Sequence, residues 1–296
     1  MAQTSQDKLL SLQYVRALAA LAVVVFHCYA TRGLVFAPDP RVTEGLRVVA
    51  AAAVDIFFIL SGFVMVYTQQ RANRAAGDFM VQRLARIVPL YWFSTMLLVL
   101  VLFIGNLAGT GLHGALHQLG QTRNFIGSSL LFASHFLHYP YPVLLPGWSL
   151  EYEILFYAIF ALAIRFGGRA HVAVAMAALA LLCLSGLLRL LCLEFAAGCL
   201  VALLYQRGWH VKAAMALVPL APLVVTLGVL RGAYAFVNSD DLYRLAYCGV
   251  PMLGLFLAAL TLSAGRHPRL LLLGDASYSI YVGHCLWLYL FTRLFP

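Results

Sequence analysis

The chain has 296 residues, of which 63% are hydrophobic and 10% are charged, and its formal net charge is +9. A soluble domain carries about 25% charged residues, so this composition indicates a polytopic membrane protein. The cations lie between apolar runs, where the positive-inside rule accounts for them, and we therefore expect no nucleic-acid partner.

Residues 9–31 form an apolar run long enough to cross a bilayer, yet the run contains Arg16 and His27. A span needs about 20 mostly apolar residues, and an ionisable side chain inside it costs several kcal/mol unless it is paired or hydrated. The spacing of Arg16 and His27 brings their side chains to within about 20° of one helix face and roughly 16 Å apart along the axis. The alternatives are an arginine that snorkels to lipid head groups and a histidine that only packs.

The second predicted span covers residues 48–68 and holds one carboxylate, Asp55, and a Ser61–Gly62 step at which helix backbones can approach closely. The arginine-rich polar stretch that follows is predicted to be cytoplasmic. The N-terminus is then also cytoplasmic, with Arg16 near the cytoplasmic face and His27 in the external half of the membrane.

Arg83 and Arg86 are three residues apart and are expected on one side of a helix. Their guanidinium groups suit phosphate, and an ordinary cytoplasmic anchor is the alternative. The third predicted span follows them and runs to about Ile104.

Residues 105–123 are predicted to form a loop, in which His113 and His117 have the i, i+4 spacing of a metal pair but no nearby acidic or cysteine ligand. Residues 125–137 are apolar but short for a crossing. Charge favours an interfacial or re-entrant segment here, because the arginines after the next span then fall on the cytoplasmic side.

The next span opens at Trp148, after a Pro-Gly break, and carries Glu153 about a turn and a half inside it. Glu151 lies nearer the end and is interpreted as a solvated flank. On this topology His27, Asp55 and Glu153 all lie in the external half of the membrane. A low dielectric and charged neighbours suit such groups to proton transfer.

The remaining predicted spans cover residues 171–188, 192–205, 213–230, 244–264 and 270–290. The predicted fold is thus an all-α transmembrane bundle of about nine or ten spans, forming one domain over residues 1–296. The last span carries a polar stripe of Ser277, Tyr278, Tyr281 and His284. The six cysteines lack metal-binding spacing and are interpreted as small buried hydrophobes, so we expect no metal.

Several blocks together resemble the acyltransferase-3 family of membrane acyltransferases. The blocks are Arg16-x10-His27, VDIFFILSGFVM around Asp55, Arg83-x-x-Arg86, WSLEYEILFY (148–157), LEFAAGCLVALLY (193–205) and GDASYSIYVGH near the C-terminus. They follow the family's order across nearly the whole chain, and the blocks around Asp55 and Glu153 look most like the exopolysaccharide O-acetyltransferases. The chain looks short for the family, and we expect no appended esterase-like domain.

The resemblance implies O-acylation of a carbohydrate hydroxyl, with cytoplasmic acetyl-CoA as the donor, in a bacterial inner membrane. It also implies the site residues: catalytic His27, Glu153 and Asp55; donor-binding Arg16, Arg83 and Arg86; substrate-binding Trp148, Ser149, Tyr278 and His284. His27 would be a general base or would carry an acetyl group, and the sequence leaves both open.

The expected partners are acyl-CoA, a carbohydrate or lipid-linked saccharide acceptor, the lipid bilayer and proteins of polysaccharide biosynthesis. The alternative function is a transporter or flippase, in which Arg16, His27, Asp55 and Glu153 would line a polar pathway. Neither inverted repeats nor paired broken helices are visible in the sequence to support it.

Overall fold

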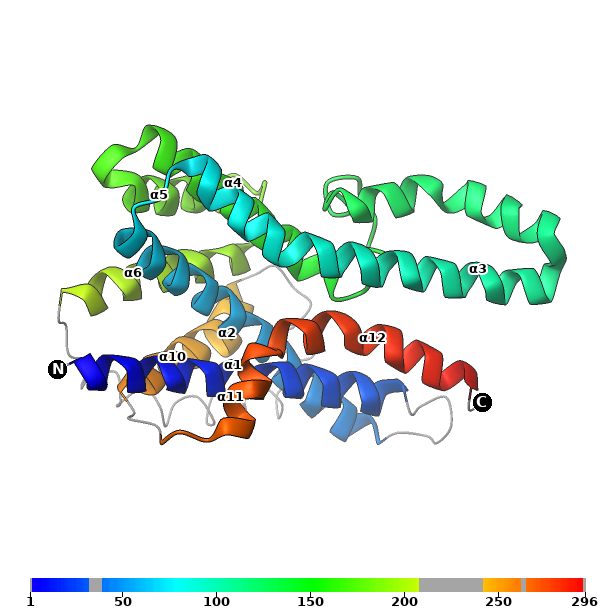
Figure 1. The fold of residues 1–296 in the computed structure, drawn as a ribbon, viewed down its shortest axis with the longest axis horizontal. Coiled ribbons are helices and arrows are strands. Elements are labelled where there is room, and N and C mark those ends of the chain that lie inside the picture. The colour runs from blue at the N-terminus through cyan, green and yellow to red at the C-terminus, as the bar shows by residue number, and fades with distance from the viewer. Residues whose placement is uncertain (1, 32–38, 208–241, 262–264, 295–296) are drawn as a thin grey trace. The chain divides into compact units, whose positions relative to one another are not determined.

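The computed structural model describes residues 2–31, 39–207, 242–261 and 265–294, and every regular element in these ranges is a helix (Figure 1). The predicted all-α class is therefore confirmed. The predicted span at 213–230 lies outside the described residues. Four helices are long and apolar enough to cross a membrane. The count of nine or ten spans stays a prediction.

The helices follow one another with short connections. They are α1 (Ala2–Thr31), α2 (Pro40–Ala72), α3 (Ala76–Leu130), α4 (Gly147–Phe166), α5 (His171–Leu184), α6 (Leu193–Gln206), α9 (Leu242–Arg244), α10 (Val250–Thr261), α11 (Pro268–Asp275) and α12 (Ser277–Leu294). A π-helical turn, Leu245–Gly249, joins α9 to α10. The four candidate spans lie in α1, α2, α3 and α4, whereas α5 and α6 have 14 residues each.

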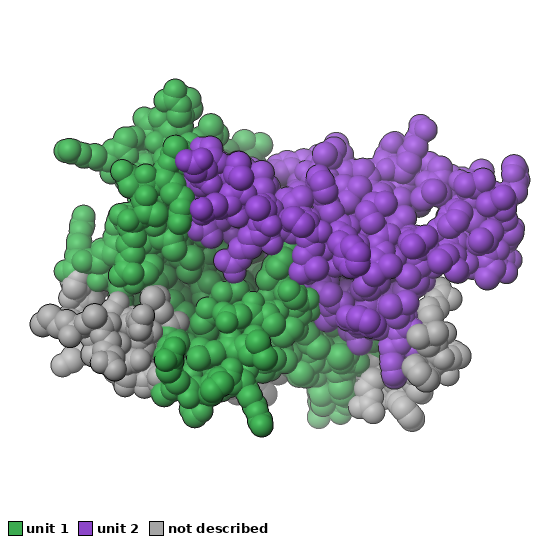
Figure 2. Space-filling model, in the orientation of Figure 1, with its two compact units in different colours: residues 1–76, 159–280 green, residues 77–158, 281–296 purple. Residues whose placement is uncertain are grey.

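The described chain divides into two compact units, coloured separately in Figure 2. Unit 1 comprises residues 1–76 and 159–280, and unit 2 comprises residues 77–158 and 281–296. Each unit has its own packing and its own polar side chains. The prediction of one domain over the whole chain stays a prediction.

Unit 1 is built on the contact between α2 and α6, which depends on two glycines. A Cβ on Gly62 would lie 2.0 Å from the carbonyl oxygen of Phe195, and one on Gly198 would lie 1.9 Å from that of Ile59. No side chain fits at either position, so the backbones of the two helices touch directly. The close approach predicted at Gly62 is confirmed.

Aromatic rings fasten α10 to this contact. The fully buried ring of Phe63 lies 5.7 Å from the ring of Tyr205 on α6 and 5.4 Å from that of Phe256 on α10, measured between centroids. Both ring pairs are edge-to-face, a favoured arrangement of aromatic side chains. The single side chain of Phe63 therefore holds three helices together.

The first half of α1 packs against α10 and α11. Ser11 donates a hydrogen bond to the carbonyl oxygen of Ala259 (2.5 Å) and Tyr14 donates one to that of Gly265 (2.5 Å). A Cβ on Gly274 of α11 would lie 2.4 Å from the carbonyl oxygen of Gln13, so this contact also requires glycine. These contacts position the helix that carries Arg16 and His27.

The predicted last span, residues 270–290, is wrong as a single helix. Pro268 starts α11, the helix ends at Asp275, and a second helix begins at Ser277. Ala276 caps α11, with its N–H bonded to the carbonyl oxygens of Gly274 and Leu272. The apolar pattern continues through this break, which is why the sequence suggests one span.

Unit 2 contains a helical hairpin, and the predicted loop at 105–123 is wrong. Residues there are helical except at Gly111, whose φ of 73° is a left-handed conformation that glycine adopts readily. The helix turns back at this point, as Figure 1 shows for α3. Tyr91 donates to the carbonyl oxygen of Ser129 (3.2 Å) and Trp92 to that of Leu130 (2.8 Å), which joins the two arms. Residues 125–130 therefore end the second arm, and the rest of the predicted 125–137 segment consists of turns.

The α2–α6 contact generates a stability prediction. Gly198→Val is expected to lower the free energy of unfolding by about 3 kcal/mol, because the two helices must separate to admit the side chain. The measurement is thermal unfolding in detergent. Gly45→Val is the matched control, since a Cβ at Gly45 of α2 meets nothing within 4 Å. Equal unfolding temperatures for the two variants would contradict the role of Gly198.

Candidate active site

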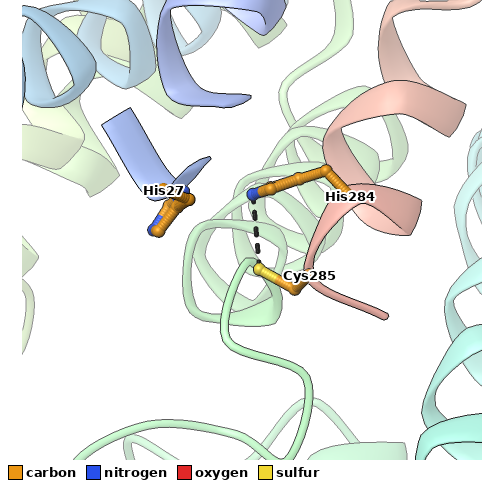
Figure 3. A group of neighbouring side chains, drawn as sticks. All are labelled: His27, His284 and Cys285. Carbon is orange, nitrogen blue, oxygen red and sulfur yellow. Dashed lines mark hydrogen bonds between the residues drawn. The ribbon is translucent and has the colours of Figure 1, made fainter. Parts of the chain in front are cut away.

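His27 lies on α1 in unit 1, and the helix itself sets the hydrogen-bonding state of its ring. Its Nδ1 is 3.0 Å from the carbonyl oxygen of Val23, one turn earlier. A carbonyl oxygen can only accept, so Nδ1 carries the hydrogen and the lone pair is on Nε2. The half-buried imidazole, labelled in Figure 3, therefore has the tautomer that a general base needs. The group that orients the ring is a backbone carbonyl. Charge balance of His27 by Asp55 or Glu153 stays a prediction.

Arg16 lies on the same uninterrupted helix, as the spacing argument requires. Its side chain is half-buried, and Nη1 donates to Oε1 of Gln13 over 3.3 Å. The backbone of Gln13 is in turn packed against Gly274 of α11. The guanidinium group is thus held near a fixed part of unit 1.

Asp55 is fully buried on α2, and its partner is an arginine 189 residues away. Nη2 of Arg244 donates to Oδ1 of Asp55 over 2.6 Å, and the side chain of Arg244 is itself buried. Glu194 of α6, 2% exposed, lies within electrostatic reach of both groups, and the charge of Arg189 also acts on Asp55. We call these four residues the carboxylate cluster.

Glu194 is the unusual member of the carboxylate cluster. Neither of its carboxylate oxygens has a hydrogen-bond partner among the described residues. Gly249 lies directly against it, since a Cβ there would be 2.8 Å from Oε1. Two carboxylates and two arginines balance in charge, so the cluster can remain in an apolar bundle while it links α2, α6 and the start of α10.

In unit 2, the two arginines predicted to bind the donor have different surroundings. Arg83 is 8% exposed, and its guanidinium carbon lies 5.5 Å from the ring centroid of Phe79 and 6.0 Å from that of Tyr157. Arg86, almost one turn later on α3, is exposed. Both charges reach the hydroxyl of Tyr157 electrostatically. Arg83 is thus built into an aromatic pocket, and Arg86 is accessible to a ligand.

Glu153 joins the same group of side chains. The hydroxyl of Tyr157, one turn further along α4, donates a short hydrogen bond to Oε1 of Glu153. Tyr157 is buried and lies beneath the guanidinium group of Arg83. Unit 2 therefore brings Glu153 and Arg83 together through Tyr157, although the two residues are 70 positions apart in the sequence.

The start of α4 is tied to α12 through Ser149 and Tyr281. Ser149 donates to the carbonyl oxygen of Pro146 (3.1 Å), so the 2.8 Å contact between Ser149 Oγ and Tyr281 Oη is a hydrogen bond donated by the tyrosine. His284 is buried on the next turn, with Nδ1 2.8 Å from the carbonyl oxygen of Tyr281. Ser149 and His284, both predicted to bind substrate, thus belong to one network.

The other two residues predicted to bind substrate are half-buried. The ring of Trp148 lies 6.3 Å from that of Tyr152 in an edge-to-face arrangement. Tyr278 lies on the first turn of α12, within unit 1. No printed contact joins Tyr278 to the carboxylate cluster.

The interpretation of Glu151 as a solvated flank is wrong. Its side chain is 3% exposed and accepts hydrogen bonds from the backbone N–H groups of Ser134 (3.1 Å) and His135 (3.0 Å). Glu151 therefore anchors the turns that precede α4. The sequence does not reveal this, because the two N–H groups lie 16 and 17 residues earlier in the chain.

Other candidate features do not coincide with the predicted site residues. A cavity of about 230 Å³ between the arms of α3 is lined by residues of α3 and by Val143. His113 and His117 are both exposed on the second arm, and no third ligand group gathers with them in the part of the chain that the structure describes.

Sequence reasoning missed Glu194, Arg244, Tyr157 and Cys285. Glu194 and Tyr157 lie inside blocks that carry the family resemblance, and Tyr157 follows Glu153 at the i, i+4 spacing at which helix side chains meet. That spacing could have identified the tyrosine. Arg244 was counted only as the start of a span, and its pairing with Asp55 has no local signal.

A helical membrane protein with a base-competent histidine and buried arginine–carboxylate groups is compatible with acyl transfer. The family model described as an acyltransferase domain (Acyl_transf_3) matches residues 9–296. The chain belongs to this acyltransferase-3 family and is therefore an acyl-transferring enzyme of the membrane. The transporter alternative is set aside on this finding.

The curated relatives agree with this assignment. Exopolysaccharide production protein ExoZ of Rhizobium meliloti is 30% identical over 256 residues, which cover 80% of this chain and 76% of ExoZ. Acyltransferase MdmB of Streptomyces mycarofaciens is 32% identical over 52% of this chain and 39% of MdmB. Protein 2 in the picA locus of Rhizobium radiobacter is 29% identical over 57% of this chain and 88% of that protein. No solved structure matches the chain.

The carboxylate cluster generates a prediction about the order of two variants. Arg244→Gln is expected to lower the free energy of unfolding by about 3–5 kcal/mol, because it removes the cation nearest to Asp55 and Glu194. Asp55→Asn is expected to cost less, since Arg244 keeps Glu194 within reach. Thermal unfolding in detergent gives the order, and Arg207→Gln, at an exposed position, is the control. A loss for Asp55→Asn that equals or exceeds the loss for Arg244→Gln would contradict this account.

Proposed function

We propose that the protein transfers an acetyl group from cytoplasmic acetyl-CoA to a hydroxyl of an exopolysaccharide or of its lipid-linked repeat unit. The observation that carries the proposal is the tautomer of His27, whose Nε2 has the lone pair needed to take a proton from a hydroxyl. The printed name of ExoZ, a protein of exopolysaccharide production, supports this class of acceptor. The bacterial inner membrane is the proposed location, with the N-terminus in the cytoplasm.

Three arginines form the proposed donor path. Arg86 is exposed and suits the phosphates of CoA through charge-assisted hydrogen bonds. Arg83 is buried beside Tyr157 and Glu153, where it stabilises the inner end of the same region. Arg16 lies about 16 Å from His27 along α1, a distance comparable to an extended pantetheine arm.

The proposed reaction requires a nucleophilic hydroxyl and an acyl thioester. His27 accepts the proton of the acceptor hydroxyl, whose oxygen attacks the thioester carbonyl and releases CoA as a thiol. An acetyl group carried by His27 is the alternative course of the same transfer. In this proposal Asp55 acts on the site from within the carboxylate cluster, and Glu153 acts through its hydrogen bond with Tyr157.

The role of His27 is tested by removing the imidazole. His27→Ala is expected to lower acetyl transfer by about a hundred- to ten-thousand-fold, the usual contribution of a general base. The measurement is transfer of radiolabelled acetyl groups into the envelope carbohydrate fraction by isolated membranes. His113→Ala, at an exposed position on α3, is the control and should transfer at the wild-type rate. Wild-type transfer by His27→Ala would remove the histidine from the mechanism.

The donor path is tested at its exposed end. Arg86→Ala is expected to raise the KM for acetyl-CoA about tenfold while the unfolding temperature stays constant, because a charge-assisted contact to phosphate is lost and no buried contact is broken. Arg83→Ala should also lower the unfolding temperature, since its side chain packs between two aromatic rings. Arg123→Ala removes an exposed charge from the other arm of α3 and is the control. An unchanged KM in Arg86→Ala would exclude the phosphate contact.

A further inference from the structure

Unit 2 contains a cysteine–histidine pair that the proposed function does not use. Sγ of Cys285 lies 3.3 Å from Nε2 of His284, as the dashed line in Figure 3 shows. Neighbouring residues on a helix normally point about 100° apart, so the two side chains have turned toward each other. The pair lies on α12, which also carries Tyr281.

The direction of this hydrogen bond follows from the other side of the ring. Nδ1 of His284 is 2.8 Å from the carbonyl oxygen of Tyr281, which can only accept, so Nδ1 carries the hydrogen. Nε2 then has the lone pair, and the thiol of Cys285 donates to it. A nucleophile, a base within hydrogen-bond reach and a third group that orients the base are the recognised parts of a nucleophilic site.

Cys285 is accessible, whereas most of the other cysteines are not. Cys183, Cys192, Cys199 and Cys248 are buried, and Cys28 and Cys285 have intermediate exposure. His284 beside it is 7% exposed, so the base is shielded while the sulfur can be reached. This is the arrangement of a reactive thiol and differs from that of a packing cysteine.

The pair belongs to the same network as predicted site residues of unit 2. The hydroxyl of Tyr281 is hydrogen-bonded to Ser149 of the Trp-Ser-Leu block. Glu153 and Cys285 both lie close enough to act electrostatically on that hydroxyl. Glu153 is in turn bonded to Tyr157, which lies beneath Arg83. The thiol is therefore part of the group of side chains that includes the proposed donor arginine.

We propose that Cys285 is a catalytic nucleophile that carries the acyl group as a thioester between the donor and the acceptor. His284 takes the thiol proton, Sγ attacks the carbonyl carbon of the acyl-CoA, and the C–S bond to CoA breaks as the new C–S bond forms. The departing CoA sulfur receives the proton from His284. The acceptor hydroxyl then attacks the acyl-cysteine, the ester forms, and the thiol of Cys285 is restored with the hydroxyl proton.

The two half-reactions are chemically balanced without any further reactant. The first exchanges one thioester for another, so the energy of the acyl bond is kept on the enzyme. The second converts the thioester to an ester. The inference rests on the proposed function, because acyl-CoA is the donor in both.

The test is a single-turnover experiment on the full-length protein in detergent with radiolabelled acetyl-CoA and no acceptor. The wild type is expected to retain protein-bound label that neutral hydroxylamine releases, and peptide mass spectrometry should place an acetyl group on Cys285. Cys285→Ala should lose at least about nine-tenths of this label, and His284→Asn should slow its appearance at least about tenfold. Cys28→Ala is the matched control, with the same exposure class, and should retain the label.

Two further measurements keep the outcomes distinguishable. CoA release and transfer to an added envelope carbohydrate acceptor are followed in the same wild-type sample. Transfer and CoA release without acetylated Cys285 would overturn this inference and leave the proposed function intact. Absence of both would overturn the proposed function and the inference together. Since the wild-type peptide map needs no substitution, the result does not depend on whether Cys285→Ala folds.

Discussion

The ion pair between Asp55 and Arg244 is the interaction on which unit 1 depends. It is buried, it joins residues 189 positions apart, and Glu194 is placed beside it from a third helix. The glycines at the α2–α6 contact are part of the same arrangement, because Gly62 lies two turns from Asp55 and Gly198 lies one turn from Glu194. If side chains held these helices apart, the carboxylates would move away from their arginine. Backbone contact and charge pairing therefore require each other.

Two histidines in different units use the same means of fixing their tautomer. Nδ1 of His27 is bonded to a carbonyl oxygen four residues earlier, and Nδ1 of His284 to one three residues earlier. In each case the helix backbone supplies the orienting group that a carboxylate supplies in many enzymes. The lone pair on Nε2 is then independent of whether a neighbouring acid is ionised. The carboxylates of this protein are free to serve packing and charge balance.

The sequence was sufficient for the features that depend on local pattern. Apolar length predicted α1, α2 and α4, the spacing of Arg16 and His27 placed both on one helix, and Gly62 marked the close contact. It failed where the outcome depends on distant groups. The partner of Asp55 and the N–H groups bound by Glu151 have no signal in the neighbouring sequence. The helix at 105–123 was missed because its glycines suggest a loop, and only Gly111 interrupts it.

The hairpin of α3 settles the relation between two distant points of the chain. The hydrogen bond from Trp92 to Leu130 returns the chain, after 38 residues, to the level it had left. However deep each arm reaches, the second cancels the first, so the parity of membrane crossings between these residues is even. Whether residues 125–137 cross on their own thus ceases to matter for the orientation of α4. Sidedness established at Trp92 holds equally for Leu130, where the turns leading into α4 begin.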